Sequence, residues 1–71
     1  MFGVEVKPKG KRKFKRLSVS MKEAPAMKRE APAHVIQHCN DHDIDIVSTE
    51  WRVINRDTDG IIALGHPLTI H

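Results

Sequence analysis

The chain has 71 residues, 12 Lys or Arg against 9 Asp or Glu, and a formal net charge of +3. This length predicts a single domain, residues 1–71, with one modest core. The only cysteine, Cys39, excludes an internal disulfide and favours a reducing, cytoplasmic location. No apolar stretch has the form of a signal peptide or approaches the ~18 residues of a membrane span, so we expect neither export nor a membrane partner.

Charge is distributed unevenly along the chain. Residues 1–29 carry ten Lys or Arg against two Glu, a balance of +8, whereas residues 30–71 carry two Arg against seven Asp or Glu, a balance of −5. Such a field can orient a small domain toward a polyanion and raise the rate of encounter. The N-terminal half is therefore where we expect an acidic partner to bind.

A basic hairpin is predicted at about residues 2–20. Its first strand is indicated by apolar residues that recur with period two, Phe2, Val4 and Val6. Pro8 and Gly10 then predict a turn. Residues 13–20 can form the return strand, with Leu17 and Val19 on one face.

A helical segment is predicted at about residues 21–43, and its start is the least certain boundary. Ser20 and Glu23 have the spacing of a capping box, but Pro25 conflicts with a regular helix from that point. Pro32 fits better as a first helical residue, so we start the main helix there and expect about three turns. The apolar side of this helix is assigned to Ala33, Val35, Ile36 and Cys39.

A C-terminal hairpin is predicted at about residues 46–65. Its first strand has alternating residues on one face, Val47, Thr49, Trp51 and Val53. Residues 61–64 read as the return strand, which His66 and Pro67 should end. The complete order is β-β-α-β-β, and it predicts an α+β fold in which one helix packs on one face of a small antiparallel sheet of two hairpins.

The turn of the second hairpin, N-R-D-T-D-G at residues 55–60, resembles the start of the calcium-binding loop of EF-hand proteins, D-x-D-x-D-G. Asn55 replaces the first carboxylate, and His66 stands where that loop has its bidentate Glu. We therefore expect a tight turn with Asp side chains bonded to the backbone, and no calcium.

The candidate binding site is the cluster of seven cations around one aromatic residue at residues 7–16. Lys and Arg that neutralise phosphates release condensed counterions, and a nearby aromatic ring can stack on an unpaired base. Phe14 falls on the face opposite Leu17, so we expect a bulge between them, and the alternative is a ring exposed for binding. A solvated loop that protects a sheet edge is the structural alternative for the whole cluster. The predicted site comprises Lys7, Lys9, Lys11, Arg12, Lys13, Phe14, Lys15 and Arg16.

Three histidines, His34, His38 and His42, lie four residues apart and share one face of a continuous helix. Zinc needs three or four ligands, and no second cysteine is present to complete the usual set. We expect a polar helix face with Cys39 as a buried thiol beside it. No metal and no cofactor are predicted.

Catalytic patterns are missing from the sequence: it has no glycine-rich phosphate loop and no ordered Ser/His/Asp set. The sequence predicts a small non-catalytic nucleic-acid-binding protein that uses its basic N-terminal hairpin. The alternative is a protein-interaction module, a regulator or inhibitor that docks on an acidic surface of a larger host enzyme. The order of hairpin, helix and hairpin resembles the layout of small phage-encoded inhibitors of host machinery, although no motif is shared with them.

Overall fold

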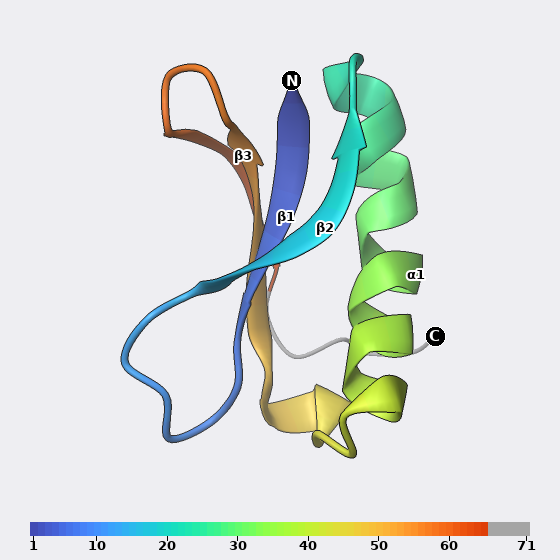
Figure 1. Cartoon of the computed structure of the whole chain (residues 1–71), viewed down its shortest axis with the longest axis vertical. Helices are drawn as coiled ribbons and strands as arrows, with labels where there is room; N and C mark the ends of the chain where they lie inside the picture. The colour runs from blue at the N-terminus through green and yellow to red at the C-terminus, as the bar shows by residue number, and fades with distance from the viewer. Residues whose placement is uncertain (66–71) are drawn as a thin grey trace.

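Two β-hairpins are connected by one long helix in the computed structural model, which describes residues 1–65 (Figure 1). The predicted α+β class and the β-β-α-β-β order are confirmed. The predicted end of the last strand at His66 and Pro67 lies outside the described residues. In chain order the elements are β1 (Phe2–Lys7), β2 (Lys15–Met21), α1 (Ala24–Asp41), a short 3-10 helix η1 (Ile46–Ser48), β3 (Glu50–Asn55) and β4 (Gly60–Gly65).

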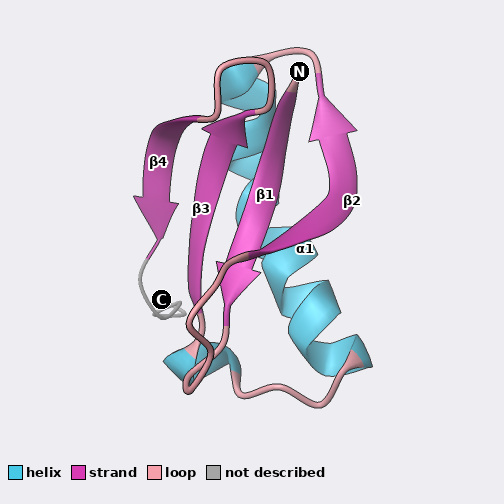
Figure 2. Cartoon of the chain, turned by 60° about the vertical axis from the view of Figure 1, so that its left-hand side comes forward, coloured by secondary structure: helices cyan, strands magenta, loops and turns pink. Residues whose placement is uncertain are grey.

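The four strands form one antiparallel sheet in the order β2-β1-β3-β4 (Figure 2). The two hairpins therefore meet through their first strands, β1 and β3, where Val4 lies opposite Val53 and Val6 opposite Trp51. This pairing leaves β2 and β4 as the two edges. It also brings the positively charged N-terminal half of the chain against the negatively charged C-terminal half.

The core lies between one face of this sheet and α1, and Figure 1 shows the helix running along that face. Four residues of α1 at a spacing of four, Met27, Ala31, Val35 and Cys39, are fully buried or nearly so. They pack against buried side chains of three strands, Val4, Val6, Leu17 and Val53. The predicted burial of Cys39, and of Leu17 and Val19 on one face of β2, is confirmed.

The predicted helix start at Pro32 is wrong, because α1 begins at Ala24 and Pro32 lies inside it. Pro25 occupies the first turn, where its missing N–H would have had no helical partner. The capping box does not form: Glu23 is the N-cap and makes no side-chain cap hydrogen bond. Burial of Met27 and Ala31 against the sheet offsets the bond lost at Pro32, and Ala33 is exposed rather than buried.

Replacing Pro32 by alanine should stabilise the protein. Alanine restores the N–H that can donate to the carbonyl of Lys28 and removes the ring from the preceding turn, so we expect the free energy of unfolding to rise by about 1–3 kcal/mol in urea denaturation. Pro25→Ala is the matched control and should change stability by less than about 1 kcal/mol, because first-turn N–H groups have no helical acceptor. A less stable Pro32→Ala variant would contradict this account.

Residues 46–48 form a 3-10 turn, not the start of a strand, so the predicted first strand is too long at its N-terminal end. The cause is Asp45, whose carboxylate accepts hydrogen bonds from the Val47 N–H at 3.1 Å and the Ser48 hydroxyl at 3.1 Å. Its carbonyl also accepts one from the hydroxyl of Thr49, at 2.8 Å. Val47 is thereby turned outward and is 62% exposed, whereas Thr49 and Val53 face the core as predicted.

The bulge in the first hairpin lies later than predicted. Glu5 pairs with Arg16 and Gly3 with Ser20, so three residues of β2 oppose one residue of β1 between those pairs. The Arg56 guanidinium crosses Gly3 and donates to the carbonyl oxygens of Leu17 and Val19, at 2.6 and 3.0 Å. These bonds satisfy carbonyl groups that the irregular ladder leaves free, and any side chain at position 3 would collide with Arg56.

The turn between β3 and β4 is tight as predicted, but the side chains that bond to its backbone are those of Asn55 and Thr58 and not the predicted Asp side chains. The Asn55 carboxamide oxygen accepts a hydrogen bond from the Asp57 N–H at 2.9 Å, and the Thr58 hydroxyl accepts one from the Gly60 N–H at 3.3 Å. Asp59 adopts a positive φ of 58°, which Asp tolerates. The tight turn is therefore confirmed.

Candidate nucleic-acid interface

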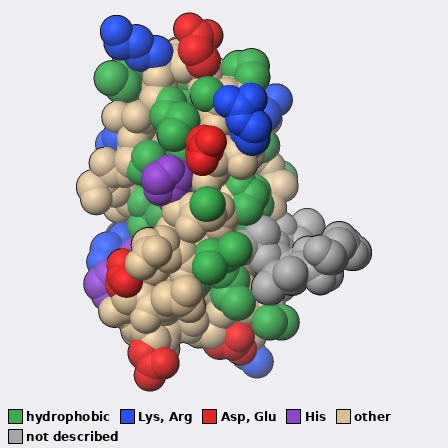
Figure 3. All heavy atoms as spheres, turned by 90° about the vertical axis from the view of Figure 1, so that its right-hand side faces the viewer, with side chains coloured by type: hydrophobic (Ala, Val, Ile, Leu, Met, Phe, Trp, Pro, Cys, Tyr) green, Lys and Arg blue, Asp and Glu red, His purple; other side chains and the backbone are tan. Residues whose placement is uncertain are grey.

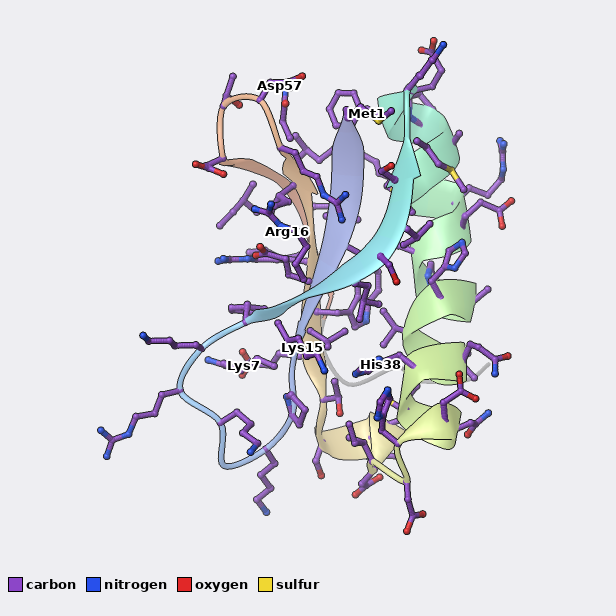
Figure 4. The ribbon with its side chains drawn as sticks, viewed as in Figure 1. Met1, Lys7, Lys15, Arg16, His38 and Asp57 are labelled. Atoms are coloured by element: carbon purple, nitrogen blue, oxygen red, sulfur yellow. The ribbon has the colours of Figure 1, made fainter. Side chains whose placement is uncertain are left out.

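The centre of the predicted site is the loop between β1 and β2, residues 8–14, called here the basic loop. Pro8 opens it with a turn in which the Lys11 N–H donates to the Pro8 carbonyl at 3.0 Å, and Gly10 supplies a φ of 88°. Figures 1 and 4 show the loop projecting away from the sheet and from α1. Its four cationic side chains are all exposed: Lys9, Lys11, Arg12 and Lys13.

The outermost cations of the predicted site are engaged inside the molecule. Lys7, the last residue of β1, forms an ion pair with Glu50 at 3.3 Å. Arg16 lies near Glu5 at 3.7 Å and near Asp59 at 3.9 Å. By contrast, the cations between these two form no ion pair with any residue in the described part of the chain: Lys9, Lys11, Arg12, Lys13 and Lys15.

Phe14 is half-buried on the sheet face that α1 does not cover. The Arg52 guanidinium lies 4.0 Å from the centre of its ring, and the Lys7 ammonium lies 5.2 Å from it. These are cation–π distances, so the ring anchors the basic loop to the sheet. Stacking of Phe14 on an unpaired base stays a prediction.

The same face carries an almost buried carboxylate, Glu5, which is 8% exposed. The Arg52 Nε–H donates to the Oε1 of Glu5 at 2.7 Å, and Nη2 forms an ion pair with the same oxygen at 2.7 Å. Arg16 approaches the other oxygen from β2. Glu5 thereby orients the Arg52 guanidinium that holds Phe14 and links the three strands β2, β1 and β3 across the open face.

Glu5→Gln should destabilise the protein. The amide keeps the shape of the side chain but removes the charge that compensates the partly buried Arg52, so we expect the free energy of unfolding to fall by about 1–3 kcal/mol. Glu50→Gln is the control: its carboxylate is half exposed in the pair with Lys7, and its loss should cost less than about 1 kcal/mol. Urea denaturation at neutral pH measures both. Equal losses would contradict the distinction between a buried and an exposed pair.

A trough between edge strand β2 and α1 continues from the basic loop. It consists of two adjoining hollows of about 310 and 350 Å³ that share Lys15, His38 and His42. The first hollow extends between residues 15–19 of β2 and the helix residues His34, Gln37 and Asp41. The second extends toward the loop and is lined there by Pro8, Lys11 and Lys13.

Lys15 and His38 point toward one another across this trough (Figure 4). The pKa of His38 lies below its ordinary value of 6.5, first because of partial burial and then because His42 and Lys15 repel the charged form, while Asp41 acts in the opposite direction. The His38 and His42 rings lie 4.4 Å apart between centres, at an angle of 42°. The trough therefore has the Lys15 ammonium on its β2 side and the imidazoles of His38 and His42 on its other side.

The outward face of α1 differs from the trough, because side chains of both charges and several hydrophobic ones are interspersed on it (Figure 3). Within residues 1–65 no three His, Cys, Asp or Glu side chains converge as metal ligands would. His66 and His71, the other histidines, lie outside the described residues. The Cys39 thiol is buried and lies 3.8 Å from the Thr49 hydroxyl.

No family model matches this chain, and no curated protein or solved structure matches it. None of the helices within residues 1–65 combines the length and apolar character needed to cross a bilayer. The function proposed below is therefore argued from the geometry of this chain alone.

The predicted site includes Lys15 but omits its neighbours in the trough, His38 and His42. Their spacing correctly indicates a shared helix face. The sequence pattern could not show which element this helix face lies against. The reason is that α1 and β2 meet through residues about twenty positions apart in the chain.

Proposed function

We propose that this chain is a small non-catalytic nucleic-acid-binding protein whose contact surface is the basic loop together with Lys15. The observation that carries the proposal is the division of the basic cluster into paired and unpaired cations. Lys7 and Arg16 are engaged by carboxylates, whereas the five cations between them have no acidic partner among residues 1–65. Five cations without acidic partners within seven residues create a local positive potential that attracts an external polyanion.

A nucleic-acid backbone meets this requirement with regularly spaced phosphates. Each phosphate neutralised by Lys or Arg releases condensed counterions, and this release supplies most of the free energy of sequence-independent binding. The loop can present its cations in a fixed direction because Phe14 anchors one end on Arg52 and the Pro8 turn shapes the other. Binding of this kind carries little sequence information, since phosphate contacts are common to all sequences.

The test is binding of nuclease-treated protein to a random-sequence duplex and a random single strand across a salt series. Affinity should fall steeply with salt. The triple variant Lys11→Ala, Arg12→Ala, Lys13→Ala should bind unrelated sequences more weakly alike, with a slope of log K against log salt that is shallower by up to about 3.

The matched control removes the same charge elsewhere. Lys22, Lys28 and Arg29 are exposed at the opposite end of the molecule from the basic loop, near the start of α1. The triple variant Lys22→Ala, Lys28→Ala, Arg29→Ala should keep most of the affinity and the slope. Equal losses in both triple variants would show that net charge alone matters and would contradict a localised site. No binding at low salt would contradict the proposal and leave an acidic protein surface as the alternative partner.

A further inference from the structure

We propose that the trough between β2 and α1 is a single-strand site, in which one phosphate of the chain lies between Lys15, His38 and His42 while flanking nucleotides follow the basic loop. This inference rests on the proposed nucleic-acid function and specifies its substrate class. The trough is continuous with the basic loop, because Lys11 and Lys13 line the end of it that Lys15 and the two histidines also line. A strand bound to the loop can therefore continue into the trough without crossing an acidic surface first.

Size favours a single strand over a duplex. Hollows of 310 and 350 Å³ are in the range of small-molecule sites, about 300–1,000 Å³, and so accommodate a nucleotide-sized group. They are bounded by β2 on one side and α1 on the other, and Leu17 of β2 and Val35 of α1 belong to the same buried cluster. A double helix is too wide to enter hollows of this size and can only lie across their opening.

The chemistry of the walls suits a phosphodiester strand. Lys15 supplies a full positive charge beside the two histidines. Imidazole N–H groups donate to phosphate oxygens, and histidine rings are among those on which unstacked bases pack. The His38 and His42 rings, tilted at 42° to one another, offer two such surfaces, one in the last turn of α1 and one at its C-cap.

In the free protein His38 has more cationic than anionic neighbours. Facing it are Lys15 from β2, Lys11 and Lys13 from the loop, His34 and Asp41 from its own helix, and His42 at the C-cap of that helix. Asp41 is the one carboxylate of this set, and it already accepts a hydrogen bond from the Gln37 amide at 2.8 Å. A bound phosphate would supply the missing negative charge at this point.

This arrangement links binding of a phosphate to protonation of His38. The free pKa of His38 is low because burial, His42 and Lys15 disfavour the charged imidazole. A phosphate beside it favours the charged form, so binding raises the pKa and takes up protons. Affinity must then increase as pH falls through the range between the bound and the free pKa. A rise of one pKa unit on binding corresponds to tighter binding of about tenfold at the acid end.

The experiment compares oligo-dT, oligo-rU and a duplex of equal length at about pH 8 and about pH 5.5, the range over which histidine titrates, at one ionic strength. These pyrimidine bases do not titrate there, so a pH effect reports on the protein. We expect both strands to bind better than the duplex, and affinity for the strands to rise on the order of tenfold at the lower pH.

Two variants and one spectroscopic measurement make the test specific. His38→Gln, His42→Gln should remove the pH dependence while keeping the salt-dependent binding of the loop, and circular dichroism verifies that it is folded. The Lys22, Lys28, Arg29 triple variant should keep the pH dependence. In NMR titrations of the wild type, the pKa of His38 should rise when oligo-dT is bound.

The outcomes separate the two proposals. Steep salt dependence with equal affinity at both pH values, or with an unchanged His38 pKa, would overturn the trough site and leave the loop proposal intact. Preference for the duplex would overturn the single-strand assignment. Failure of the wild type to bind any of the three at low salt would overturn both.

Discussion

The contact on which the rest of the structure depends is the packing of a stripe of buried residues on α1 against the central strands of the sheet. Met27 and Val35 belong to the same buried cluster as Val4 and Val6, which lie in β1, the strand of the first hairpin that pairs with β3 of the second. A chain of this size can bury only one such layer. The position of α1, the length of the core and the hollow between α1 and β2 all depend on that contact.

The opposite face of the sheet is stabilised by a different kind of interaction. There a nearly buried Glu5 binds Arg52 and approaches Arg16, while Arg56 crosses Gly3 to reach carbonyl groups of β2. Each contact joins a residue of the first hairpin to one of the second or links adjacent strands. Charges that are separated along the sequence are thus partly neutralised in space, with the carboxylate desolvated only where two arginines surround it.

This neutralisation explains why the candidate site is smaller than the basic cluster. The sheet engages Lys7 and Arg16 because they are strand residues whose neighbours carry carboxylates. The cations of the loop lie beyond the last paired residues and have no such neighbours among residues 1–65. Beside the loop, Lys15 at the start of β2 lines the trough together with His38 and His42.

Patterns of short range predicted the strands, the hairpin turns and the α+β class, because alternation and turn residues act over a few positions. Phe2 to Val6 and Thr49 to Val53 are such cases, as is the Asn55 turn. Long-range burial decided the rest. Because burial of α1 against the sheet outweighs the tendency of proline to break a helix, α1 continues through Pro32. The same packing of α1 against the sheet places His38 opposite Lys15. The sequence determines the sign and the spacing of the charges. Which charges form ion pairs was decided only by the tertiary structure, because it places strands that are distant in the sequence side by side.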